Sequence, residues 1–108
     1  MVERIKDTVD LIVKAADDKI GQDITVLDID PRAGICDYFI IITGRNVNHT
    51  QAIADEIETK MKDQGINTRT VEGYREGEWI LLDFGDTIVH IFTADQRQFY
   101  NLEGLWKN

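Results

Sequence analysis

The stretch WILLDFGDTIVHIF, residues 79–92, has the pattern of two apolar strands joined by a two-residue Gly-Asp turn. Residues that face each other across such a hairpin share one side of the sheet. One side is then almost purely aliphatic and pairs Ile80 with Ile91, Leu82 with Val89, and Phe84 with Thr87. The other side is chemically mixed and pairs Trp79 with Phe92, Leu81 with His90, and Asp83 with Ile88.

Two interpretations of the mixed side stay open from composition alone, whereas the aliphatic side is expected to pack on helices. In the first interpretation, Trp79 and Phe92 cover a second small core while His90 and Asp83 form a hydrogen-bonded pair, since tryptophan is highly buried on average. In the second, this side is partly open, with aromatic anchors and a polar edge. That mixture is enriched at protein interfaces.

Helical periodicity appears in three other parts of the chain. The apolar residues recur at helical spacing over residues 5–20, 47–64 and 95–105. Gly21 and Gly65 are placed to end the first two helices, and Asn46 or Asn48 can cap the second.

Strand patterns lie between these helices. In addition to the hairpin, strands are predicted over residues 23–30, 38–43 and 66–71. The segment YFIIIT, residues 38–43, is apolar without alternation, as expected of a central strand that is covered on both faces. We therefore predict a single α/β domain over residues 1–108, with a mixed five-stranded β-sheet packed with helices.

Composition narrows the classes of function. The chain has 108 residues and a formal net charge of −8. Little direct RNA binding is expected, because affinity for phosphate backbones comes from Lys and Arg, so a partner recruited by charge should be a basic protein surface. We also expect a cytoplasmic protein without membrane binding, since the sequence has neither a long apolar run nor a signal-peptide or transit-peptide pattern.

Three aspartates suggest an alternative interpretation as an enzyme. Asp28 and Asp30 share one face of a predicted strand, and Asp83 could add a third carboxylate for Mg²⁺ in nucleotidyl or phosphoryl transfer. Against this, residues 44–46 read Gly-Arg-Asn, whereas a nucleotidyltransferase needs a Gly-Ser turn. The chain has no serine, and Cys36 has no flanking cation that would activate it. We therefore expect no catalysis, no cofactor and no metal.

Several segments, in their order and spacing, resemble the ribosomal silencing factor family, also called the Iojap family. They are GQDI at 21–24, LDI at 27–29, DYFIIITG at 37–44, HTQAIADEI at 49–57, EWILLDFGDTIVHIF at 78–92 and RQFYNLEGLW at 97–106. The resemblance covers nearly the whole chain. The chain departs from the family pattern at residues 43–46, where it has Thr-Gly-Arg-Asn instead of the usual Thr-Gly-Thr-Ser. Asn46 can still replace Ser as a helix cap.

The resemblance implies a translational repressor that binds the large ribosomal subunit through its fourteenth ribosomal protein. Bound there, it would block association with the small subunit and lower translation when nutrients are short. The resemblance also implies a fold similar to that of nucleotidyltransferases without the active site. An acidic chain suits a Lys- and Arg-rich ribosomal protein better than rRNA. Whether the free protein forms a homodimer stays open.

The partner-binding residues are carried over from the family's motifs. The tryptophan of its Glu/Asp-Trp-Ile/Val segment falls on Trp79, which we expect to be the main anchor. The other candidates share the face of Trp79 in the hairpin or come from the C-terminal motif at its rim. They are Leu81, Asp83, His90, Phe92 and Tyr100. Whether the C-terminal helix contacts the partner or only packs on the sheet stays open.

Overall fold

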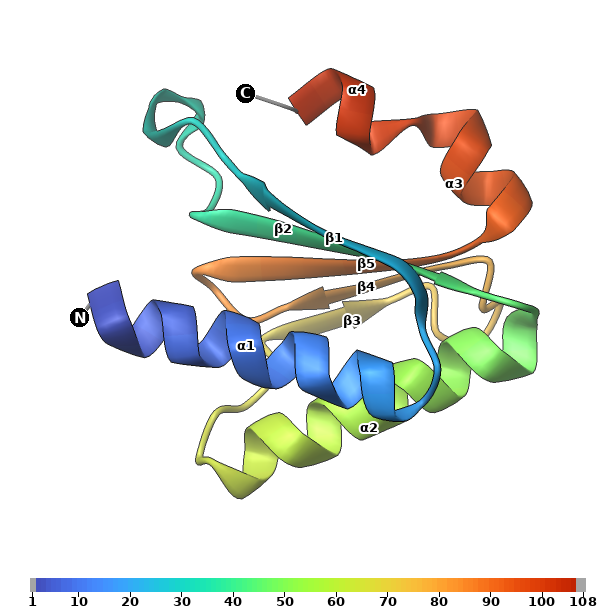
Figure 1. Ribbon diagram of the computed structural model, residues 1–108, viewed down its shortest axis with the longest axis horizontal. Helices are drawn as coiled ribbons and strands as arrows, with labels where there is room; N and C mark the ends of the chain where they lie inside the picture. Colours follow the sequence, from blue (N-terminus) through green and yellow to red (C-terminus); the bar gives the residue numbers. More distant parts are fainter. Residues whose placement is uncertain (1, 107–108) are drawn as a thin grey trace.

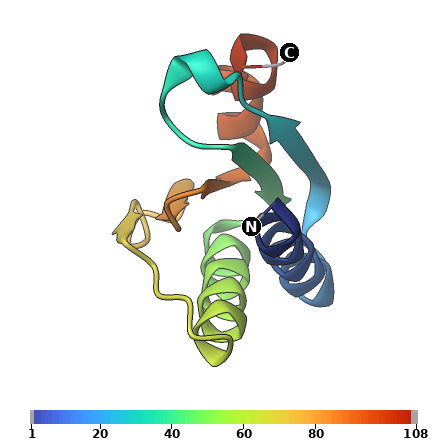
Figure 2. The same cartoon turned by 90° about the vertical axis from the view of Figure 1, so that its left-hand side faces the viewer.

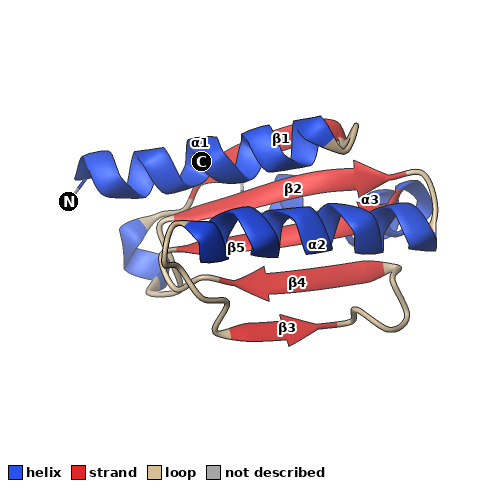
Figure 3. Cartoon of the chain, turned by 90° about the horizontal axis from the view of Figure 1, so that it is seen from below, coloured by secondary structure: helices blue, strands red, loops and turns tan. Residues whose placement is uncertain are grey.

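A mixed sheet with the strand order β1-β2-β5-β4-β3 forms the centre of the molecule (Figure 3). The computed structural model describes residues 2–106, and the side chains of residues 7–30 and 32–105. The strands are β1 (Gln22–Asp28), β2 (Tyr38–Gly44), β3 (Thr70–Glu72), β4 (Trp79–Asp83) and β5 (Thr87–Thr93). β2 and β5 pair in parallel, whereas the other neighbours are antiparallel. The prediction of a mixed five-stranded sheet is confirmed.

Helices cover the two faces of the sheet unequally (Figures 1 and 2). On one face lie α1 (Val2–Asp18) and α2 (Val47–Asp63), and on the other lie the shorter α3 (Ala94–Tyr100) and α4 (Leu102–Trp106). The short 3-10 helix η1 (Pro31–Ala33) lies in the connection between β1 and β2. On the α3 side, the described helices lie over the half of the sheet that contains β1, β2 and β5, and leave β3 and most of β4 uncovered (Figure 2).

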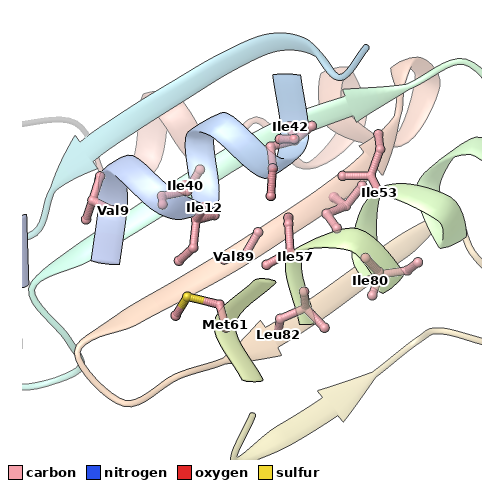
Figure 4. Close-up of a cluster of buried hydrophobic side chains, with 14 residues drawn as sticks. Val9, Ile12, Ile40, Ile42, Ile53, Ile57, Met61, Ile80, Leu82 and Val89 are labelled. Carbon is pink, nitrogen blue, oxygen red and sulfur yellow. The ribbon is translucent and has the colours of Figure 1, made fainter. Parts of the chain in front are cut away.

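The main core lies between the sheet and the pair α1 and α2 (Figure 4). The hairpin register pairs Ile80 with Ile91 and Leu82 with Val89, and all four side chains are fully buried. The predicted aliphatic face is therefore confirmed. Burying one such side chain contributes roughly 1.5–3 kcal/mol to folding. The helices supply further fully buried side chains: Ile12, Ala16, Ile53, Ala54, Ile57 and Met61.

A second, smaller cluster lies on the opposite face, under α3 and α4. Its fully or nearly fully buried members are Leu27, Ile29, Phe39, Ile41 and Phe92. β2 contributes to both cores, because Ile40 and Ile42 face α1 and α2 while Phe39 and Ile41 face the second cluster. The predicted central strand is confirmed.

Two predicted elements were wrong in extent. The strand expected over residues 66–71 is only Thr70–Glu72, because Ile66 belongs to the turn that caps α2 and donates its N–H to the Met61 carbonyl at 2.9 Å. The helix expected over residues 95–105 is broken in two at Asn101, which adopts a left-handed conformation with φ of 48°.

The start of α2 is fixed by its capping residue and by a buried histidine. The side chain of Asn46 accepts the N–H of His49 at 2.9 Å, so Asn46 rather than Asn48 is the N-cap. The His49 ring accepts the Arg45 N–H at Nδ1 and donates from Nε2 to the Lys19 carbonyl at 2.7 Å. His49 therefore joins the end of α1 to the start of α2.

Both long helices end in the same hydrogen-bonded motif with different residues at its left-handed position. In α2 this residue is Gly65, at φ of 78°, as predicted. In α1 it is Ile20, at φ of 60°, rather than the predicted Gly21. Glycine is instead required at position 21, directly after Ile20, because a Cβ there would lie 2.9 Å from Ile42 Cγ2. A β-branched residue is strained in this conformation.

We predict that Ile20→Gly raises the free energy of unfolding by about 1 kcal/mol, because it removes the left-handed strain. The side chain of Ile20 is 67% exposed, so little packing is lost. Urea denaturation measures the change. The matched control is Gly65→Ala, which should lower stability by a similar amount; an Ile20→Gly variant less stable than wild type would contradict the interpretation.

Candidate protein-binding site

The hairpin of β4 and β5 presents the mixed face as its sequence predicts. Trp79 lies opposite Phe92, Leu81 opposite His90, and Asp83 opposite Ile88. This face points away from α1 and α2, since Trp79, Ile88 and Phe92 belong to the second cluster. The structure thus brings the five hairpin candidates onto one face.

Trp79 is held in place on two sides. Its indole Nε1–H donates to Nδ1 of His90 at 3.1 Å, and its ring lies 5.1 Å from the Phe92 ring and 4.5 Å from the Tyr100 ring, measured between centroids. The side chain of Trp79 is half-buried. An indole fixed in this way would lose little conformational freedom in an intermolecular contact.

His90 lies beneath Trp79 and is 4% exposed. Because Nδ1 accepts the indole N–H, the neutral ring carries its proton on Nε2, which has no hydrogen-bond partner among the described residues. Burial lowers the pKa of His90 from its ordinary 6.5 to about 4. The predicted pair of His90 with Asp83 does not form, since Asp83 Oδ1 accepts the Gly85 N–H at 2.7 Å instead.

Both interpretations of this face hold in part. Phe92, at 1% exposure, and His90 belong to a second core. Trp79, Leu81 and Asp83 are half-buried, and Tyr100 is 43% exposed at the rim. The candidate residues therefore form two levels, with Phe92 and His90 supporting the residues that reach the surface.

Two exposed carboxylates and one cation lie beside this half-open face. Glu72 on β3 lies opposite Leu81 and is exposed, and Asp86 is exposed in the turn after Asp83. Arg69 is a cation beside the turn, with its guanidinium close to Gly85. Aromatic and aliphatic groups within an acidic rim suit a basic protein surface better than nucleic acid.

Arg97 holds α3 and α4 in place over the sheet, a role that the sequence did not predict. Its guanidinium donates to the Glu103 carboxylate at 2.7 Å, the Asp23 carbonyl at 2.6 Å, Thr43 Oγ1 at 2.8 Å and Thr25 Oγ1 at 2.9 Å. No residue of α3, all of which the structure describes, is fully buried. The polar contacts of Arg97 therefore do much to hold this helix on the sheet. The sequence could not predict this role, because the hydrogen-bond acceptors of Arg97 on β1 and β2 are distant in sequence.

We predict that Arg97→Lys lowers the free energy of unfolding by about 2 kcal/mol or more, because one ammonium cannot reach four acceptors arranged around a planar fork. Thermal and urea denaturation measure the loss. The control is Arg32→Lys, which alters an exposed ion pair with Asp30 and should leave the transition unchanged. Equal stability of Arg97→Lys and wild type would contradict this role.

The three aspartates of the enzymatic alternative do not converge. Asp28 lies opposite Tyr38 on the side of α1 and α2, whereas Asp83 lies opposite Ile88 on the other face. Asp30 accepts hydrogen bonds from Arg32, which lowers the pKa of that carboxyl. Burial raises the pKa of the Cys36 thiol to about 11. Within the described part of the chain, no group of three His, Cys, Asp or Glu residues could hold a metal ion.

The burial of His90 predicts a pH-dependent stability. Unfolding restores the pKa of 6.5 from about 4, so the unfolded chain binds the extra proton and stability falls as pH drops from 6.5 to 4. The shift in the pKa of His90 contributes roughly 3 kcal/mol to the free energy of unfolding at neutral pH, and this contribution is lost by pH 4. Urea denaturation across this range measures it for wild type and for His90→Gln, which keeps an acceptor for Trp79 but does not titrate. An identical pH dependence in the two proteins would contradict the prediction.

Fold and site together define a small α/β domain with a half-open aromatic face on β4, in which the three candidate aspartates do not converge. None of the helices that the structure describes has the length and apolar character to cross a membrane. The family described as "Ribosomal silencing factor during starvation" matches residues 2–108, and the chain belongs to this family.

Individual relatives agree with this assignment. The ribosomal silencing factor of Bacillus subtilis is 41% identical over 101 residues, which are 94% of this chain and 86% of that protein. A crystal structure of a Chromobacterium violaceum protein superposes with a TM-score of 0.91 at 32% identity, over 94% of this chain and 85% of that one. A mouse protein named "Mitochondrial assembly of ribosomal large subunit protein 1" is 27% identical, and the match covers 94% of this chain and 46% of the mouse protein.

Proposed function

We propose that this protein represses translation in the cytoplasm by binding the large ribosomal subunit through its fourteenth ribosomal protein, which blocks association with the small subunit. The observation that carries the proposal is the half-open aromatic face of β4, with its acidic rim. The family's name supports a ribosomal role, and the name of the mouse relative supports the large subunit as the partner.

The charge of the chain favours a protein contact over an RNA contact. A net charge of −8 opposes docking on phosphates, but it attracts the basic proteins that line a ribosome. In this arrangement Asp83 and the exposed Glu72 meet Lys or Arg side chains at the rim. They mainly raise the association rate and select the partner.

The apolar residues supply the binding energy in the proposed interface. Trp79, Leu81 and Tyr100 contact the partner directly, since all three reach the surface. Phe92 and His90 act from beneath by holding the indole of Trp79. Affinity concentrated in a few packed anchors is the usual pattern at protein interfaces.

The helical face explains how the bound protein would exclude the small subunit. When the β4 face docks, α1 and α2 point away from the partner, because they cover the opposite side of the sheet (Figure 1). α1 carries five acidic and three basic residues, and α2 carries four and two. This surface would oppose the incoming RNA by its bulk and its negative charge.

Co-sedimentation with separated ribosomal subunits on a sucrose gradient tests the proposed function. The protein should migrate with the large subunit alone, and addition of the small subunit should yield less of the joined particle. Migration with the small subunit, or no migration with either subunit across a range of salt, would contradict the proposal.

We predict that Trp79→Ala weakens binding to the large subunit by about 2 kcal/mol or more. Since Trp79 also packs in the second cluster, the unfolding transition is measured in parallel, and Leu81→Ser tests the same face without removing the indole. The control is Val26→Ala on β1, whose side chain is 41% exposed and lies on the α1 side opposite Ile40. Wild-type affinity for both site variants, with folded protein, would remove β4 from the interface.

A further inference from the structure

Phe99 is an apolar side chain left almost entirely in solvent. It lies in α3 and is 77% exposed, more than any other exposed large hydrophobic among the described residues. Its ring meets the Tyr100 ring edge-on, with 5.1 Å between centroids and an interplanar angle of 88°. Single exposed apolar residues are common on protein surfaces, so exposure alone does not give Phe99 a role.

Its position relative to the candidate site distinguishes Phe99 from the other exposed residues. Tyr100 lies between Phe99 and Trp79, with 4.5 Å between the centroids of Tyr100 and Trp79. Trp79 in turn packs on the buried Phe92 at 5.1 Å. Four aromatic rings therefore form a continuous series from the second core to solvent, and Phe99 is its outer end.

We propose that Phe99 is a further contact residue of the partner-binding surface, which extends from β4 across Tyr100 onto α3. This inference rests on the proposed function and adds a specificity-determining residue to it. The partner surface that fits is a basic protein with an apolar depression beside its cationic groups. Phe99 would fill that depression while the rim carboxylates contact the cations.

The charges near Phe99 favour a basic partner over a second copy of this chain. Asp95 lies one helical turn before Phe99 and is exposed. Arg97, the basic residue of α3, is turned inward and bound to Glu103 and Thr43. A two-fold contact of this surface with itself would bring the carboxylates of both copies together, and like charges across an interface weaken it.

The network of Arg97 also prepares Phe99 for binding. It ties α3 to Asp23 and Thr25 of β1 and to Thr43 of β2, so the backbone that carries Phe99 has a fixed position before a partner arrives. An aromatic side chain on such a helix loses little conformational freedom in contact. Phe99 is therefore suited to add affinity as well as selectivity.

The test compares Phe99→Ala with Leu105→Ala in binding to isolated large subunits. Leu105 is a matched control, because it is 72% exposed and lies on the neighbouring α4 outside the aromatic series. Phe99→Ala should raise the dissociation constant about tenfold, whereas Leu105→Ala should change it by less than about twofold. Both variants should unfold at the wild-type temperature, and Phe99→Leu should recover part of the affinity.

Other outcomes separate the two proposals. Wild-type affinity in Phe99→Ala, while wild type binds the large subunit, would overturn this inference alone. Failure of wild type to bind would overturn the proposed function. An equal loss in Leu105→Ala would show that general apolar exposure on α3 and α4 matters, rather than Phe99. If Phe99→Ala changes self-association in sedimentation velocity without changing subunit binding, a second copy is the occupant, and the inference is overturned.

Discussion

The parallel pairing of β2 with β5 is the constraint on which the candidate site depends. Its register sets His90 beside Ile41 and Phe92 beside Thr43, in the middle of the sheet. Both strands must therefore be covered on both faces of the sheet. The pair α1 and α2 covers one face, and α3, which follows β5 directly, covers the other. β4 is one strand further out, where the cover stops. The boundary between buried and open sheet falls at Trp79, which explains why this residue both packs and reaches the surface.

A side chain at such a boundary must satisfy two environments. The indole N–H of Trp79 would lose a hydrogen bond if it were covered by a partner without an acceptor, and His90 removes this difficulty by accepting it within the protein. The histidine can do so because burial keeps it neutral, with its pKa at about 4. The chemistry beneath the surface thus leaves an apolar face exposed, and in the proposed interface the acidic rim would supply selectivity around it.

Much of the fold follows from local sequence signals. The Gly-Asp turn fixed the register of the β4 and β5 pair, and unbroken apolar character identified β2 as central. The prediction failed where distant contacts decide the conformation. Asn101 breaks the last helix in two, and Ile20 rather than Gly21 adopts the left-handed conformation, while a Cβ on Gly21 would lie too close to Ile42. The sequence also grouped the hairpin residues correctly, but their two levels depend on where α3 ends, which periodicity does not determine.

Hydroxyl-radical footprinting of the protein, free and bound to large ribosomal subunits, tests most directly which face binds. If the β4 face binds, oxidation of Leu81 and Tyr100 should fall on binding. Tyr74, which donates to Asp55 of α2 from the loop before β4, should be oxidised equally in both states. Protection of Tyr74 with unchanged oxidation of Leu81 and Tyr100 would show that the helical side faces the ribosome and would contradict binding through β4.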